Sequence, residues 1–355
     1  MQRSPLRRRG RAGRMTTRDA RGRRRVAFAT QPQFPSSRLG PHPSLRDIDR
    51  RAKLFIRLSK EPSTRRGYRQ QLNRHWFPFL RSYHLPLRPS VSTLVRFVVW
   101  ASDRVRCVDK ILSAVRWHYG FSDRRWAKLR NDSRVRNTIL GHKKLSARPT
   151  KRSPPLLPVH LAAFVRHALR PGASYNDLLA ATLAMVGFGG VLRLGELTLP
   201  PHKQDRDPRR LVRRSTVEVS DAAFSFFCPK MKQDRVWQGA SITVARANST
   251  PDFNFISLFR LYLARRDARY PDFPYLFVNA SGKVPLPSFL TSRLSCFAPG
   301  ITGHGLRAGG ATYLASRGVH PDVIQRLGRW SSETWAIYIR DNPALAAAIQ
   351  RSKVT

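Results

Sequence analysis

Apolar side chains recur at helical spacing through the first part of the chain. Tyr68, Leu72 and Trp76 follow one another every four residues and so share one helix face. This helix is expected to begin at Pro62. It is expected to kink or end at Pro78, because an internal proline removes a backbone hydrogen bond. Three further helices are predicted: one capped near Ser90, one over 108–118 that stops at Gly120, and one over 132–140.

The second half of the chain mixes helical spacing with short β-rich runs. Alternating and β-branched or aromatic residues predict strands over 216–219, 223–228 and 239–244, which are close enough in sequence to form a small antiparallel sheet. Helical patterns surround them, over 158–169, 176–187, 253–265, 305–317 and 321–327. The pattern therefore indicates an α+β domain, mainly α, with a small antiparallel sheet among helices.

Composition divides the chain into four parts. Residues 1–44 are rich in Arg, Gly, Ser and Pro and are expected to form a disordered basic arm; an import signal and an organelle transit peptide have similar compositions. Residues 45–145 form the helical domain, 146–157 a proline-rich linker, and 158–355 the α+β domain. We expect no membrane association, because no apolar run approaches the roughly 20 residues of a membrane-spanning helix.

The charge of the chain indicates its partner. Among 355 residues, 66 Lys and Arg stand against 21 Asp and Glu, a net charge of +45. Such a surface favours a polyanion, and nucleic acid is the expected one. A ribosomal or histone-like protein is the simpler alternative, but seven Trp are many for that class. Three separated cysteines predict neither a zinc site nor a disulfide scaffold, and we expect no cofactor or metal.

Three short motifs occur near the C-terminus, and their order along the chain is informative. They are His304-Gly-Leu-Arg307 with Ala308-Gly-Gly-Ala311 after it, Leu327-Gly-Arg-Trp-Ser331, and Ala336-Ile-Tyr-Ile-Arg340. Together they resemble the signature of the tyrosine recombinase (phage-integrase) family, and in detail its eukaryotic mobile-element, Crypton-like members. Val191-Leu-Arg-Leu-Gly-Glu-Leu197, about 110 residues earlier, resembles the first motif of that family. The family cuts and rejoins DNA through a phosphotyrosine.

The resemblance implies a role for each polar residue of these motifs. Arg193 and Arg307 would bind the scissile phosphate, and Glu196 would support Arg193 or a neighbouring helix. His304 would act as a base or hydrogen-bond donor, and Trp330 would donate its indole N–H to the phosphate. Tyr338 would be the nucleophile; it lies eight residues after Trp330, one fewer than in many bacterial and phage members. Lys232, between two predicted strands, would be the general acid, with Lys230 as the alternate.

The function implied is that of a site-specific DNA recombinase or integrase that forms a 3′-phosphotyrosine without metal or ATP. Its helical domain would be a core-binding, SAM-like domain, and the two domains would form a C-shaped clamp around double-stranded DNA. The expected assembly is a homotetramer on DNA, with no small-molecule substrate. The protein would reside in the nucleus if eukaryotic, or the cytoplasm and nucleoid if bacterial, and would not be secreted.

Two alternatives remain open. A type IB topoisomerase uses the same chemistry as a monomer and makes no recombinant product. A domesticated, non-catalytic DNA-binding protein would keep the basic surface without needing Tyr338.

Overall fold

The computed structural model describes residues 43–147, 153–232, 234 and 236–331. The chain divides into two compact units, Met1–Lys60 and Glu61–Thr355. The described part of the first unit is helix α1 (Leu45–Leu58), which the sequence pattern did not predict; Ser44 caps it by accepting the Asp47 N–H at 3.2 Å. No helix in the described ranges has the length and apolar character needed to cross a membrane.

The second unit begins with a run of helix in three segments. These are α2 (Pro62–Gln71), a π-helical turn η1 (Leu72–Trp76) and α3 (Phe77–Ser82). The predicted start at Pro62 is confirmed. The chain does not end its helix at Pro78: the backbone N–H of Phe77 reaches the Leu72 carbonyl, five residues back. This wider turn directly before the proline lets the helical path continue without the hydrogen bond that proline cannot make.

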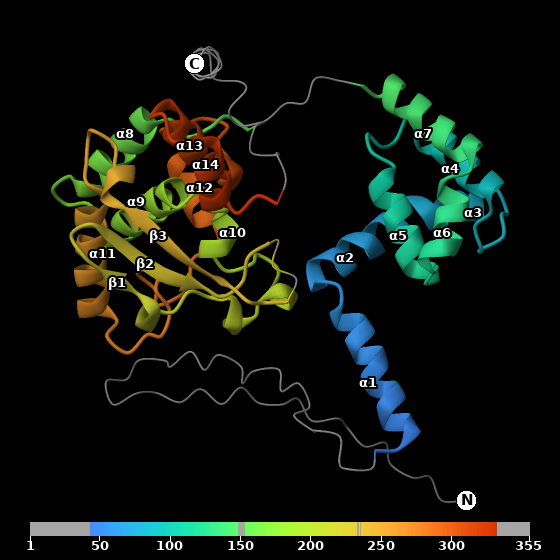
Figure 1. The fold of residues 1–355 in the computed structure, drawn as a ribbon, viewed down its shortest axis with the longest axis horizontal. Helices are drawn as coiled ribbons and strands as arrows, with labels where there is room; N and C mark the ends of the chain where they lie inside the picture. Colours follow the sequence, from blue (N-terminus) through green and yellow to red (C-terminus); the bar gives the residue numbers. More distant parts are fainter. Residues whose placement is uncertain (1–42, 148–152, 233, 235, 332–355) are drawn as a thin grey trace, which may run out of the picture. The chain divides into compact units, whose positions relative to one another are not determined.

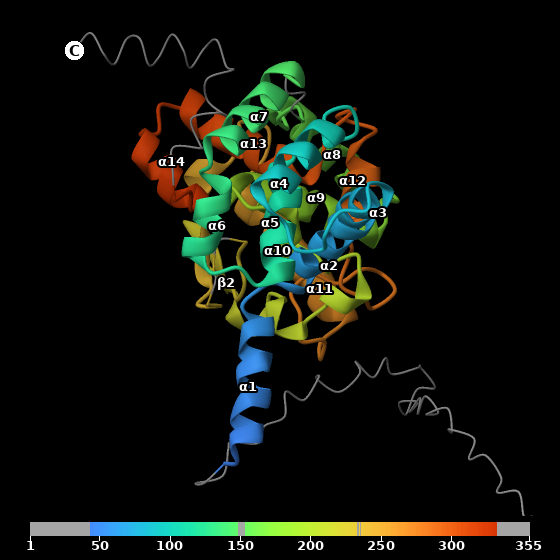
Figure 2. The same cartoon turned by 90° about the vertical axis from the view of Figure 1, so that its right-hand side faces the viewer.

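The other helices of this region surround an aromatic core. They are α4 (Val91–Ala101), α5 (Asp109–Tyr119), α6 (Asp123–Arg130) and α7 (Ser133–Leu145). The predicted cap Ser90 and the left-handed stop at Gly120, with φ 60°, are confirmed. Figure 1 and Figure 2 show α4 beside α7, and the two helices are in contact. Trp76 is fully buried in the core, with its ring edge-on to Phe97 at 5.0 Å.

A small sheet and its helices form the rest of the described chain. Strands β1 (Glu218–Val219), β2 (Ala223–Cys228) and β3 (Ala240–Ala245) pair antiparallel in that order, with Phe224 opposite Val244. The mainly α, α+β fold with a small antiparallel sheet is therefore confirmed. The helices are α8 (Pro158–Leu169), α9 (Tyr175–Gly189), α10 (Leu194–Leu197), α11 (Phe255–Arg269), α12 (Pro287–Leu294), α13 (Gly303–Ser316) and α14 (Pro321–Gly328). Short 3-10 turns lie at Lys203–Asp205, Pro208–Arg210, Arg214–Thr216 and Arg246–Asn248.

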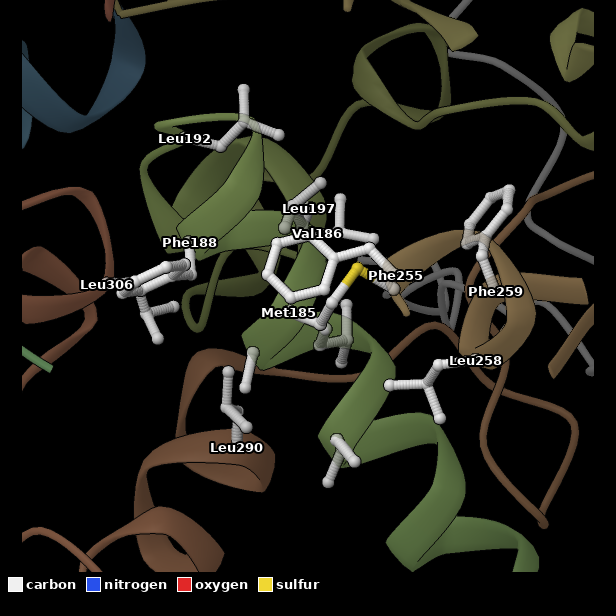
Figure 3. Close-up of a cluster of buried hydrophobic side chains, with 14 of the residues drawn as sticks. Met185, Val186, Phe188, Leu192, Leu197, Phe255, Leu258, Phe259, Leu290 and Leu306 are labelled. Carbon is white, nitrogen blue, oxygen red and sulfur yellow. The ribbon is translucent and has the colours of Figure 1, made fainter. Parts of the chain in front are cut away.

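Helix α9 is the centre of this part of the molecule. All its residues from Leu178 to Gly189 are buried, as expected of a helix that is apolar on every side. Figure 3 shows Met185 and Phe188 of α9 among side chains of α11, α12 and α13. Phe224 of β2 stacks on Phe259 of α11 with ring centroids 3.9 Å apart, which joins the sheet to the same core. Figure 1 shows α11 beside the strands.

Candidate active site

The turn after α9 presents Arg193. Gly190 ends the helix, Val191 adopts a left-handed conformation with φ 51°, and Arg193 lies directly before α10. Glu196 holds this residue twice: its carboxylate accepts the backbone N–H of Arg193 at 3.1 Å and the guanidinium at 3.2 Å. Glu196 is buried, so its charge is available mainly to this arginine and its neighbours. The expected support of Arg193 by Glu196 is confirmed.

Helix α13 carries His304 and Arg307 at its first turns. Thr302 caps the helix by accepting the His304 N–H at 3.3 Å. Arg307 is fully buried, donates to the carbonyl of Gly328, and lies 4.1 Å from the centre of the Trp330 ring. An arginine without solvent around it needs polar or aromatic partners, and the Gly328 carbonyl and the Trp330 ring are two of them.

Two glycines allow the backbone of α13 to lie close to its neighbours. A Cβ on Gly309 would come within 2.1 Å of the Leu156 carbonyl oxygen, and one on Gly310 within 2.0 Å of the Phe188 carbonyl oxygen. The backbone of α13 therefore approaches both its neighbours more closely than any side chain would permit. The small run 308–311 therefore allows α13 to pack closely against its neighbours.

The loop between β2 and β3 places its two lysines differently. Lys230 is nearly buried; its amino group donates to the carbonyl of Asp234 and lies 5.2 Å from the Trp237 ring centre. Asp234 in turn accepts the Gly239 N–H at 2.9 Å, which fixes the loop. Lys232 is exposed. Of the two, Lys230 has contacts typical of a residue that supports the loop.

The electrostatic surroundings of His304 identify the residues that share its site. Its pKa is lowered from the ordinary value, first by loss of solvent around the ring and then by the positive charges of Arg307, Arg193 and Lys232. The ring lies at the surface, so solvent moderates these effects. Three cations from three separate segments therefore act on one histidine. The charges of three predicted site residues therefore act on a fourth, His304, and Lys232 is the lysine among them.

Trp330 packs into the wall of this site. Its ring is buried with Val191, Leu314 and Ile324 in a small apolar cluster, and its face covers the Arg307 guanidinium. Gly328 is required beside it, since a Cβ there would come within 1.6 Å of the ring. Trp330 is thus both a core residue and a direct neighbour of Arg307. The predicted nucleophile, Tyr338, lies outside the described residues.

Arg329 also lies near these charged residues, although the motif resemblance gave it no role. Burial lowers its pKa, and the opposing charge of Glu196 and the like charge of Arg193 also act on it. In sequence it stands between Gly328 and Trp330, but in a chain with 66 basic residues one more arginine gives no signal. In the described ranges, no three His, Cys, Asp or Glu side chains are grouped as metal ligands would be.

Comparison with known proteins yields structural neighbours only. The sequence matches no family model and no curated protein sequence with which it was compared. The XerH site-specific recombinase bound to palindromic difH substrate, in a post-cleavage complex, superposes with a TM-score of 0.53 at 15% identity, over 80% of this chain and 78% of that one. A lambda integrase dimer bound to a COC′ core site gives 0.45 at 12% identity, over 82% and 96%. XerA recombinase gives 0.41 at 16% identity, over 87% and 98%. The likeness to XerH, a site-specific recombinase, shows that this chain has the fold of a tyrosine recombinase catalytic domain.

Proposed function

We propose that this protein is a tyrosine recombinase that cuts and rejoins double-stranded DNA. The observation that carries the proposal is the convergence of Arg193, Arg307 and Lys232 on His304. The fold, which is that of the recombinase XerH, supports it. Its substrate would be a phosphodiester of the DNA backbone, because a phosphate bound by Arg193, Arg307 and Lys232 would offset the repulsion between their positive charges.

The two arginines would bind the non-bridging oxygens of the scissile phosphate. A guanidinium is always charged and offers two parallel donors, which suits a planar pair of phosphate oxygens. Glu196 is the carboxylate that holds Arg193, and it is already engaged by that residue. The remaining positive charge of Arg193, Arg307 and Lys232 is therefore available to stabilise the negative charge that develops on the phosphate in the transition state.

Tyr338 would attack the phosphorus atom. A free phenol has a pKa of about 10, so only about one in a thousand is ionised at pH 7, a handicap of roughly 4 kcal/mol. His304 would accept or share the phenolic proton, and its lowered pKa keeps the ring neutral and able to do so near neutral pH. Lys232 would protonate the departing 5′-oxygen, and Trp330 would shield the phosphate from water.

Cleavage would form a phosphotyrosine bond at the 3′ end and release a 5′-hydroxyl. Because the new ester conserves the energy of the broken one, the reverse attack by another 5′-hydroxyl rejoins DNA without ATP. We further propose residues 45–145 as a core-binding domain and 158–355 as the catalytic domain, which close around one duplex. Joining two sites would require a tetramer, and the motif resemblance favours a mobile-element enzyme of the nucleus.

The test is to trap the covalent intermediate. The protein is incubated with DNA flanking its own gene, nicked so that a short 5′-hydroxyl fragment diffuses away after cleavage. Denatured products are scored for DNA-linked protein. We expect an adduct with the natural chain and none with Tyr338→Phe, while the DNA affinity of this variant stays within a few fold because only one hydroxyl is removed.

The other outcomes separate the alternatives. Adducts that persist in Tyr338→Phe would show that another residue is the nucleophile. Adducts together with relaxation of unrelated supercoiled DNA, and no exchange of strands between two sites, would indicate a type IB topoisomerase. Tight binding of the flanking DNA with no adduct would indicate a non-catalytic binder.

A further inference from the structure

Arg329 has an unusual backbone and an unusual side chain. It follows α14 in the left-handed conformation, with φ 55°, which non-glycine residues rarely adopt. Its Nε atom is shut off from solvent without a hydrogen-bond partner. A charged side chain in such a place is costly to keep, so its contacts are expected to serve the structure around it.

Those contacts reach the turn that carries Arg193. One terminal nitrogen, Nη2, donates to the Gly190 carbonyl at 3.3 Å and to the Val191 carbonyl at 3.2 Å. Both carbonyls follow the end of α9, where helix carbonyls lack partners along the chain and the helix dipole favours a positive charge. Arg329 thus caps the end of α9 from a distant segment of the chain. The second carbonyl that it binds, that of Val191, lies two residues before Arg193.

The neighbours of Arg329 in sequence hold the other arginine. The Gly328 carbonyl accepts a hydrogen bond from Arg307, and the Trp330 ring lies over the same guanidinium. The turn itself is fixed, since Arg329 N–H bonds to the Arg326 carbonyl at 2.9 Å and Trp330 N–H to the Gln325 carbonyl at 3.1 Å. Residues 328–330 therefore connect the turn of Arg193 with the side chain of Arg307.

We propose that Arg329 is a positioning residue for strand cleavage, an assignment that rests on the proposed function. It holds the α9–α10 turn against residues 328–330 and so sets the spacing of Arg193 and Arg307 before DNA binds. It acts through the Gly190 and Val191 carbonyls and not on the phosphate. The two phosphate-binding arginines come from segments more than 100 residues apart. The Arg329 side chain holds the turn of the first, and its neighbours Gly328 and Trp330 contact the second.

Two variants and one matched control test this assignment. Arg329→Met keeps much of the volume and removes the donors, whereas Arg329→Lys keeps a charge on a shorter reach. Arg317→Met removes an exposed arginine at the end of α13 and serves as control. Adduct formation is timed on the nicked substrate at saturating DNA, and DNA affinity is measured over a range of salt. Unfolding temperatures identify any variant that fails to fold.

We expect Arg329→Met to form the adduct about 100-fold more slowly, since small displacements of a catalytic group cost rates of this order. Arg329→Lys should recover part of the loss, and Arg317→Met should match the natural chain. The salt dependence of binding should not change, because no phosphate contact is removed. In hydrogen exchange without DNA, peptides over 186–193 should exchange faster in Arg329→Met and not in Arg317→Met.

Natural adduct rates together with unchanged exchange in Arg329→Met would overturn the assignment. A salt slope that falls by about 0.9, the contribution of one phosphate contact, would instead make Arg329 a direct phosphate ligand and overturn it too. If the natural chain binds its DNA but never forms an adduct, the proposed function fails. The exchange measurement needs no DNA, so it then still decides whether Arg329 holds the turn.

Discussion

Lys230 and Lys232 are two residues apart and have different chemical surroundings. The amino group of Lys230 is occupied by the Asp234 carbonyl and the face of Trp237. Lys232 is exposed and adds to the positive field at His304. A general acid needs a proton that it can release toward the leaving oxygen. We propose Lys232 for this role, because the Lys230 amino group is already engaged by the Asp234 carbonyl and by the Glu61 carboxylate.

DNA in which sulfur replaces the bridging 5′ oxygen at the cleavage site tests this choice of lysine. We expect Lys232→Ala to slow cleavage of ordinary DNA by about 10²–10⁴-fold, the usual contribution of a general acid. DNA with sulfur as the bridging 5′ atom should restore most of the rate, because a thiolate leaves without being protonated. Lys230→Ala is the matched control: any loss it shows should be the same with both substrates. A sulfur rescue seen for Lys230→Ala and not for Lys232→Ala would reverse the two roles.

At the scale of elements, the position of α13 depends on the absence of side chains at 309 and 310. Gly310→Ala would place a methyl group 2.0 Å from a backbone oxygen of α9, which cannot rotate away. We expect this change to destabilise the fold by about 1–3 kcal/mol, as overpacking of a core does, and to slow cleavage by moving His304 and Arg307. Denaturant unfolding measures the first effect and adduct formation the second.

Gly141 provides the control for that prediction. It also lies inside a helix, α7, but a Cβ there would meet nothing within 4 Å. Gly141→Ala should therefore stabilise the helix by about 0.5–1 kcal/mol, because alanine loses less backbone freedom than glycine. If the two substitutions have the same effect on stability, close packing of α13 is not what requires Gly310.

The elements that the sequence predicted well are those with strong periodicity and clear ends. Helix α8 and strand β2 have the predicted bounds, and Ser90 and Gly120 mark helix ends as their chemistry requires. Helix α6 was missed because only Trp126 and Leu129 of this short helix pack against the core, which is too few to give a clear helical period. Helix α7 runs on to Leu145, beyond the predicted end at 140, since its last turn is basic and suits a helix C-terminus.

The candidate site was predicted residue by residue but not in its connections. Motif resemblance named Arg193, Lys232, His304 and Arg307, and in the structure the charges of the first, second and fourth of these act on His304. The motif resemblance gave no role to Arg329. The side chain of this residue donates to two backbone carbonyls that lie more than 130 residues earlier in the chain. Contacts to backbone carry no sequence signature at the accepting residue, so only a three-dimensional structure reveals them.

At the scale of the whole molecule, charge is expected to control DNA binding. The net charge is +45, and residues 1–44 alone contain twelve arginines and one aspartate. Each phosphate contact releases counterions, so the logarithm of the binding constant should fall by about 0.9 per contact for each tenfold rise in salt. With about 6–10 contacts, affinity would drop by roughly 10³–10⁵ between 50 and 200 mM salt. Fluorescence anisotropy with duplex DNA measures this slope.

Removing residues 1–42 separates the arm from the rest of the chain. If the arm binds phosphates, the truncated protein should show a shallower salt slope and weaker binding, yet the same adduct rate at saturating DNA. That division is expected because Arg193, Lys232, His304, Arg307 and Tyr338 all remain, so chemistry after binding is untouched. An unchanged slope would assign the arm to another task, such as import, whereas a lower adduct rate at saturation would mean that the arm also helps to arrange DNA in the site.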